Sequence, residues 1–206
     1  KSSVLSAQHS LTRNLAGLNN VMTRLSTGKQ LNSGKDNPAG LISSEQLASQ
    51  LEALEAETNA LRRADANANI SEGYGSQVSG LMSELNGLVV ASANSAGMSQ
   101  AEIDANQMQI DDTIASVERI TGQAVSSMSG LAMPNNGNAE VEALYNGAVA
   151  DLSSLKSGGA NSLASGNFDA AQAVVEGAGL DVAIARGKVG AFQKYTIEPS
   201  INSNNV

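Results

Sequence analysis

Few residues in this sequence have the type and spacing that chemistry at a site requires. His9 is the single histidine, and its neighbours Gln8 and Ser10 form no pattern for nucleophilic catalysis or zinc binding. Asp111 and Asp112 are adjacent, and adjacent residues of a helix point in different directions rather than forming a carboxylate pair. We interpret His9 and both aspartates as solvent-facing side chains.

The sequence also contains no pattern typical of a phosphate-binding or metal-binding site. The run Gly73-Tyr74-Gly75 has neither a preceding strand nor the following Lys-Ser/Thr of a phosphate loop. Asp104, Asp111, Asp112 and Glu118 could attract calcium loosely, but they lack the spacing of an EF-hand. The absence of cysteine removes disulfides and thiolate metal sites. The sequence therefore predicts no catalytic residue, no cofactor and no metal, and thus no enzyme.

The composition favours long helices packed side by side. The 206 residues are 2% aromatic, with no tryptophan and two phenylalanines, whereas compact cores usually depend on large aromatic side chains. There is no apolar run of 18 residues, so no membrane span is predicted. The first residue is Lys1, no signal-peptide pattern follows it, and we expect that both ends have been trimmed.

The charge is unevenly distributed along the chain. The net charge is −8, which argues against nucleic acid as a partner. Residues 1–38 carry +4, residues 39–118 carry −10 and residues 119–206 carry −2. Two interpretations stay open: solvated helix faces, or a basic arm that meets the acidic body of a neighbouring subunit.

Residues 4–27 have apolar side chains at spacings of mostly three and four, which predicts an amphipathic helix. Such a stripe needs a partner helix, and none is obvious nearby in the sequence. The apolar positions are Leu5, Leu11, Leu15, Leu18, Met22 and Leu25.

Residues 28–38 predict a sharp break between two helices. Arg24 suits the carbonyl end of the first helix, and Gly28 suits a residue with positive φ just after it. Pro38 suits the first turn of the next helix. The polar residues between them, Asn32, Ser33, Gly34, Lys35, Asp36 and Asn37, include several turn formers.

Residues 39–95 predict one very long helix. Its leucines at 41, 47, 51, 54 and 61, followed by Val78, Leu81, Leu85 and Leu88, suit coiled-coil-like packing. Glycines at 73, 75 and 80 weaken the middle, and we expect them where another backbone comes close or the helix bends.

A second long helix follows in the opposite direction. Ser99 and Glu102 form a capping box, and Ile103, Gln107, Ile110, Ile114, Val117, Thr121 and Ala124 repeat as a heptad. Residues 125–138 are predicted to be irregular, residues 139–156 a short helix, and residues 168–197 the last helix, ended by Pro199.

The predicted fold is all-α: an elongated antiparallel bundle of long coiled-coil-like helices with a short irregular or hairpin tip. We divide it into an N-terminal helix and loop (1–38), a helical rod (39–198, with a tip at 125–167) and a truncated tail (199–206).

Three stretches resemble bacterial flagellins, the subunits of the flagellar filament. The densest is Arg24-Leu25-Ser26-Thr27-Gly28-Lys29, with Leu31-Asn32-Ser33 and Lys35-Asp36-Asn37-Pro38-Ala39-Gly40. Ser92-Ala93-Asn94 resembles the end of the family's long helix, and 187–194 with Ile197-Glu198 resembles its C-terminal signature. The chain looks like a short form that lacks the large variable outer domains and the final C-terminal helix.

The resemblance implies a structural subunit that self-assembles through its terminal helices into a helical tube for motility. It implies an extracellular flagellar location, export without a cleaved signal peptide, and three kinds of partner: other flagellin subunits, an export chaperone, and cap or junction proteins. Nucleic acid and membrane are not expected partners. The predicted subunit interface consists of Leu11, Leu15, Leu18, Arg24, Leu25, Gly28, Asn32, Lys35, Asp36 and Pro38. The alternatives are a hook–filament junction protein of the same superfamily and a flagellin-like surface adhesin or enzyme.

The resemblance also bears on the animal innate receptor for flagellin. Family members that this receptor detects carry an arginine and a glutamate on the long helix, where this chain has Glu84 and Gly87, followed by Leu88. A reversed charge at an interface arginine costs affinity. We therefore expect weak activation of this receptor or none.

Overall fold

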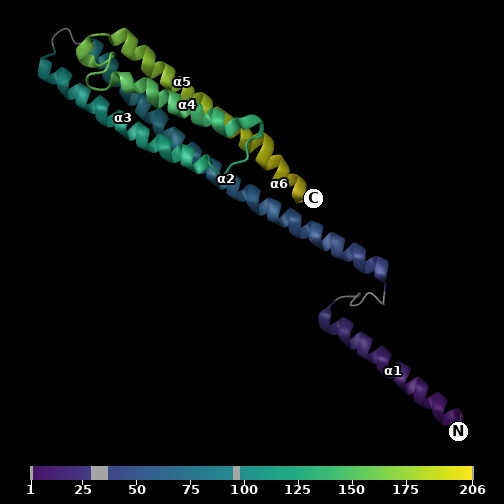
Figure 1. Ribbon diagram of the computed structural model, residues 1–206. Helices are drawn as coiled ribbons and strands as arrows, with labels where there is room; N and C mark the ends of the chain where they lie inside the picture. The colour runs from purple at the N-terminus through teal and green to yellow at the C-terminus, as the bar shows by residue number, and fades with distance from the viewer. Residues whose placement is uncertain (1, 29–36, 95–97, 206) are drawn as a thin grey trace. The chain divides into compact units, whose positions relative to one another are not determined.

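The computed structural model describes residues 2–28, 37–94 and 98–205, and every regular element in those ranges is helical (Figure 1). The chain forms two compact units, residues 1–56 and residues 57–206. The first contains α1 (Ser2–Thr27) and the beginning of α2 (Pro38–Ala93). The second contains the rest of α2 with α3 (Gln100–Met128), α4 (Gly137–Leu152), α5 (Phe168–Phe192) and α6 (Glu198–Asn204). The all-α prediction is confirmed.

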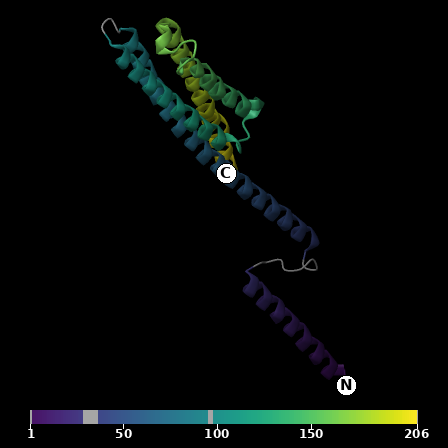
Figure 2. The same ribbon diagram turned by 60° about the vertical axis from the view of Figure 1, so that its left-hand side comes forward.

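The second unit is an antiparallel helical bundle. Figures 1 and 2 agree that α2, α3, α4 and α5 lie side by side, with each helix reversing the direction of the one before it. Its core is a line of heptad positions along each helix, which we call the seam of that helix. The seams are mostly aliphatic, with some buried polar side chains such as Gln107 and Thr121, and Tyr145 and Phe192 are the aromatic residues buried among the described positions.

The structure of α3 agrees closely with the prediction from its sequence. Ser99 caps it through the predicted capping box: the Ser99 side chain accepts from the Glu102 amide, and the Glu102 carboxylate accepts from the Ser99 amide at 2.7 Å. Ile110, Ile114 and Val117 are completely buried. The polar seam residue Gln107 donates to the carbonyl of Leu155 and accepts from the amide of Leu163, both at 2.8 Å. Gln107 thus anchors the chain that connects α4 to α5.

The connection between α3 and α4 is shorter than the sequence predicted. The helix α3 runs on to Met128, into the stretch 125–138 that we expected to be irregular, because Val125 and Met128 still pack on the core. The Asn138 side chain then organises the turn: it donates to the carbonyls of Met128 and Leu131 and accepts from the Met133 amide.

The prediction that Pro199 ends the last helix is wrong. The helix α5 passes into a π-helical turn, Gln193–Ile197, and then into α6, where Pro199 is near the N-terminus of the helix. A missing N–H is tolerated in a first helical turn. The π turn also explains the spacing of five between the seam residues Phe192 and Ile197, because a π turn accommodates one extra residue.

Only one of the predicted glycines, Gly75, meets another helix. A Cβ at Gly75 would lie 2.6 Å from the Tyr145 hydroxyl oxygen of α4 and 2.7 Å from Cγ of Arg186 on α5. The Arg186 guanidinium crosses back to α2, where it pairs with Glu72 at 2.6 Å and donates to Ser79 at 2.9 Å. We call Gly75, Tyr145, Arg186, Glu72 and Ser79 the glycine crossing.

Electrostatics follow from this packing. Burial raises the pKa of the Tyr145 hydroxyl to about 12, and the Glu72 carboxylate adds to the rise. The hydrogen bonds from Arg186 to Glu72 raise the pKa of the guanidinium. Tyr145 is therefore neutral and Arg186 charged throughout the physiological range, and the buried Tyr145 oxygen has no hydrogen-bond partner among the described residues.

Candidate subunit interface

The apolar stripe of α1 is fully exposed. Its side chains repeat at spacings of seven, four, three, four and three, which places them within about 80° of one another around the helix axis. The exposed fraction of each lies between 52% and 80%. The stripe comprises Val4, Leu11, Leu15, Leu18, Met22 and Leu25. Sequence analysis missed Val4 and chose Leu5, which is also exposed but lies about 100° away.

The end of α1 matches its prediction. Arg24 lies in the last turn, where its charge complements the carbonyl ends. Gly28 follows with φ of +65°, the left-handed conformation that glycine adopts without strain. Pro38 is the first residue of α2, and the side-chain oxygen of Asn37 accepts from the Gly40 amide at 3.0 Å. The predicted interface residues Asn32, Lys35 and Asp36 lie outside the described residues.

The beginning of α2 exposes apolar side chains as well. Leu47, Leu51 and Leu54 follow heptad spacing, in phase with the buried Thr58 further along the same helix. Each of the three leucines is more than 40% exposed, and so is Ile42. The predicted first seam of this helix is therefore present in its spacing, but the leucines of its first five turns or so lie on an accessible surface.

The stretch that was predicted to differ from the receptor contact lies near the end of α2. Glu84 and Gly87 are exposed, and no atom lies within 4 Å of a Cβ built at Gly87. Leu88 is half-buried and packs against the core. The structure thus places two of these three residues on the surface and gives the third a packing role.

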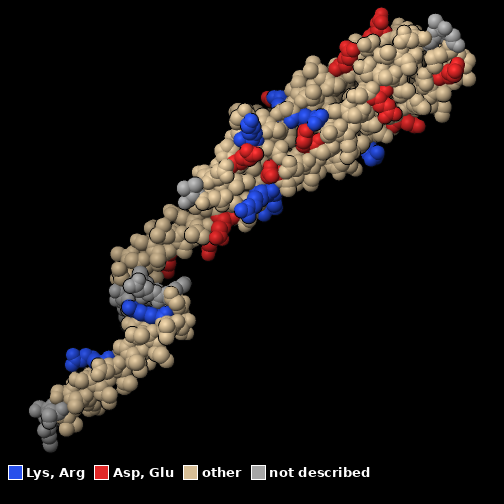
Figure 3. All heavy atoms as spheres, turned by 180° about the vertical axis from the view of Figure 1, so that it is seen from behind, with Lys and Arg blue, Asp and Glu red and all other residues tan. Residues whose placement is uncertain are grey.

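The bundle has acidic side chains concentrated at one end. The glycine crossing divides it into a distal half, which contains the turn from α2 to α3, and a proximal half. The distal half (76–121 and 145–184) has ten acidic residues and two basic ones. The proximal half (57–75, 122–144 and 185–206) has six acidic residues and five basic ones. Figure 3 shows acidic side chains alone at the distal end of the visible face. One end of the bundle therefore attracts cationic partners far more than the other.

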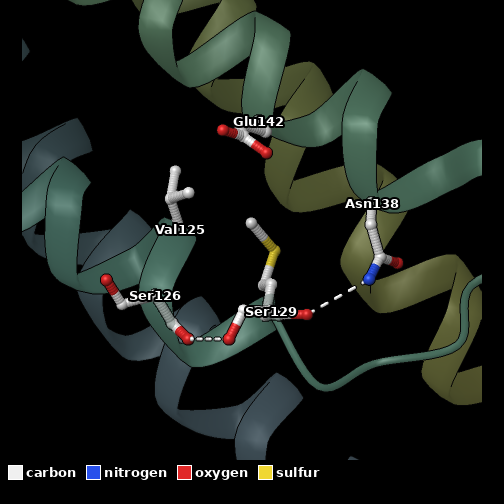
Figure 4. Close-up of a pocket in the computed structure, with 6 residues that line it drawn as sticks. Val125, Ser126, Ser129, Asn138 and Glu142 are labelled. Atoms are coloured by element: carbon white, nitrogen blue, oxygen red, sulfur yellow. Dashed lines mark hydrogen bonds between the residues drawn. The ribbon is translucent and has the colours of Figure 1, made fainter.

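A shallow pocket of about 270 Å³ lies between the end of α3 and the start of α4. Figure 4 shows that two of its polar side chains already have internal partners: Ser129 donates to the Ser126 carbonyl, and Asn138 donates to that of Met128. Glu142 is the one carboxylate among the lining residues. A single carboxylate beside Val125 provides neither an acid–base pair nor a metal site.

The candidate chemical residues are scattered. His9 is exposed on α1, and Asp112 is exposed on α3. Asp111 is not simply solvated as predicted, because its carboxylate accepts from Gln107 and from the amide and hydroxyl of Ser157. Within the described ranges, no group of three metal-ligating side chains comes together. No helix in these ranges is both long and apolar enough to span a bilayer.

The N-terminal part of the chain, which carries the exposed apolar surfaces of α1 and α2, is similar to a known protein family. Residues 1–130 match the model of the bacterial flagellin N-terminal helical region. The chain belongs to the flagellin family. The match covers α1, the segment that connects it to α2, α2 itself and α3, and so includes every residue of the predicted subunit interface.

Individual flagellins show the same relationship. The flagellin of Salmonella rubislaw is 30% identical over 122 residues, which cover 58% of this chain and 24% of that protein. The polar flagellin F of Vibrio parahaemolyticus is 38% identical over 109 residues, 52% of this chain and 28% of its own length. The matched region therefore spans about a quarter of these relatives. The resemblance of residues 187–198 to the C-terminal flagellin signature stays a prediction.

Proposed function

We propose that this chain is a structural subunit of the bacterial flagellar filament and assembles through the apolar faces of α1 and the beginning of α2. The observation that carries the proposal is the α1 stripe, whose six side chains are exposed within the residues that match the flagellin family model. Burying one such side chain completely stabilises a contact by about 1.5–3 kcal/mol. Six of them supply the driving force for association.

The geometry of the stripe suits a helical partner. A stripe about 80° wide with spacings of three and four is the surface that a second helix covers in coiled-coil packing. Contacts between different surfaces of successive copies generate a helical filament when the rotation from one copy to the next does not close into a ring. Arg24, Gly28 and Pro38 serve this arrangement by fixing the end of α1 and the start of α2.

Other partners follow from the proposed role. A filament subunit of this family acts in motility outside the cell and meets an export chaperone and the cap or junction proteins. Recognition by the innate receptor is weak, because Glu84 presents a negative charge and Gly87 offers no side chain at the two positions that receptor-detected members fill with arginine and glutamate.

The test is incorporation into filaments. Labelled chain is mixed with short filament seeds from a flagellin such as those compared above, and incorporation is followed by electron microscopy and sedimentation. We expect the unmodified chain to enter the filaments and a Leu15→Asp, Leu18→Asp variant to stay in the supernatant. Both leucines are at least 52% exposed, so the unfolding midpoint of the variant should match that of the parent.

The matched control is Met108→Asp on α3. Met108 is 68% exposed, so the change adds one negative charge, half of that in the test variant, to an accessible apolar position outside the proposed interface. This variant should enter filaments as the parent does. Equal incorporation of the two aspartate variants, or none by the unmodified chain, would refute the assignment of the α1 stripe.

A further inference from the structure

The outer face of α2 carries a glycine repeat that no contact within the described chain explains. Gly73, Gly80 and Gly87 recur at intervals of seven, all three are exposed, and no atom lies within 4 Å of a Cβ at any of them. Each glycine costs a helix about 1 kcal/mol relative to alanine. Gly75 differs, because Tyr145 and Arg186 occupy the space beside it.

The same face of α2 has no exposed charged side chain over about six turns, and charged side chains flank this stretch at both ends. Between Arg63 and Glu84 its exposed side chains are small, apolar or neutral, and Ile70 is 50% exposed at its centre. The other exposed positions are Ala66, Asn69, Gly73, Ser76, Gln77, Gly80 and Ser83. Glycines and small residues let a second helix approach closely. The surface has the character of a contact face rather than a solvated one.

The charges at the two ends are opposite and symmetric about Gly73. Arg62 and Arg63 stand eleven and ten residues before Gly73, respectively, and Glu84 stands eleven residues after it. All three side chains are exposed, and none belongs to an ion pair found in the described ranges. An antiparallel copy of α2 centred on Gly73 would bring both arginines of each chain to Glu84 of the other. A parallel copy in register would place like charges together.

The neighbouring helix α5 supports the same centre. Cγ of Arg186 lies beside Gly75, and α5 runs antiparallel to α2, so Gly187 lies close to the level of Gly73. Gly187 also has no atom from another element within 4 Å of its Cβ position. Leu180 and Ile184 of α5 are 61% and 41% exposed. A two-fold axis perpendicular to the helices at this level would therefore place glycine over glycine on both α2 and α5, with the apolar side chains nearby.

We propose that two copies of this chain associate as an antiparallel two-fold pair through the outer face of α2, with Gly73 of both copies at the crossing. A closed isologous pair satisfies its own interface and does not propagate. The pair is thus a form of the unassembled chain, and it is distinct from the filament contact through α1.

A single-cysteine experiment tests the two-fold axis, because the natural chain has no cysteine. In a Gly73→Cys variant the two thiols of a pair lie beside each other, within the Cα separation of about 4.4–6.8 Å that a disulfide requires. Mild oxidation should convert most of this variant to covalent dimer. The control is Gly122→Cys on α3, which is also helical and exposed with no atom within 4 Å. Equal cross-linking of the two variants would overturn the proposal.

A charge exchange tests the antiparallel direction independently. Sedimentation equilibrium at low salt should show dimers of the unmodified chain, and either Glu84→Arg alone or Arg62→Glu with Arg63→Glu should raise the dissociation constant roughly tenfold or more. Combining all three changes should restore it. A monomeric parent, or a combined variant as weak as the separate ones, would refute the pairing. Neither result bears on filament incorporation through α1, which is measured separately.

Discussion

Replacing Gly75 by alanine should destabilise the bundle, although the same change two residues earlier should stabilise it. At Gly73 the added methyl enters open space, so Gly73→Ala should gain the helix propensity of alanine, about 0.5–1 kcal/mol. At Gly75 the methyl would lie 2.6 Å from the Tyr145 oxygen and 2.7 Å from Cγ of Arg186. Both distances are well below van der Waals contact, so one of the neighbouring helices must move.

The magnitude follows from how little these neighbours can yield. The Tyr145 ring is completely buried, and Cγ of Arg186 lies near its backbone rather than at a flexible end. Overpacking of this kind costs about 1–3 kcal/mol. Displacing Arg186 also weakens its partly exposed pair with Glu72, which is worth at most about 1 kcal/mol. After the propensity gain, Gly75→Ala should lose about 1–2 kcal/mol, so the two variants should differ by about 2 kcal/mol or more.

Thermal unfolding followed by circular dichroism at 222 nm, at low protein concentration, measures this difference. For a unit of this size 1 kcal/mol shifts the midpoint by about 2–4 °C, so Gly75→Ala should melt at least about 4 °C below Gly73→Ala. Adding Tyr145→Phe removes the oxygen that meets the methyl and leaves no partner unsatisfied, because that oxygen has none among the described residues. The double variant should therefore recover part of the loss. If both alanine variants stabilise the chain equally, the glycine crossing is wrong.

Three further predictions concern the seam, the cap and the receptor stretch. Ile114→Asp buries a charge at a completely buried position and should cost more than about 3 kcal/mol; a midpoint within 2 °C of the parent would show that the seam is misassigned. Hydrogen bonds from the Ser99 backbone and then its side chain hold the pKa of Glu102 below its ordinary value of 4.5, so the stability they add is present above that pH and is lost as pH falls through the lowered pKa. Ser99→Ala should reduce this acid dependence in a urea titration repeated across pH 3–6. In a reporter-cell dose response the unmodified chain should be weak and a Glu84→Arg, Gly87→Glu variant stronger, whereas potent activation by the parent would contradict the interpretation of this stretch.

Local chemistry made much of the fold predictable. The capping box at Ser99 and the heptad of α3 are complete within about 25 consecutive residues, so no distant contact was needed to recognise them. The same holds for Gly28, whose positive φ follows from its place after the last turn of a helix. The α1 stripe was predictable as well, although the sequence pattern placed Leu5 in the stripe and the helix geometry places Val4 there.

Tertiary contacts decided what the sequence left open. The sequence did not distinguish the glycines of α2 from one another. In the structure Gly75 contacts Tyr145, which lies 70 residues further along the chain, whereas Gly73 contacts no other helix. This difference depends on where α4 packs. The sequence predicted Asp111 to be a solvated carboxylate, but in the folded chain its carboxylate accepts a hydrogen bond from the Ser157 amide.

Pro199 is the clearest case. By itself, a proline late in a helical pattern predicts an ending, because it lacks an amide hydrogen and clashes with the preceding turn. In the bundle, Ile197 is completely buried and Ile201 packs against the core, so the helix continues through a π turn that leaves the proline in a first-turn position. The sequence by itself determined the helices, their caps and their apolar faces, because these depend on near neighbours. Only the tertiary structure decided which glycine is crowded and where the last helix ends, because those outcomes depend on burial against residues far along the chain.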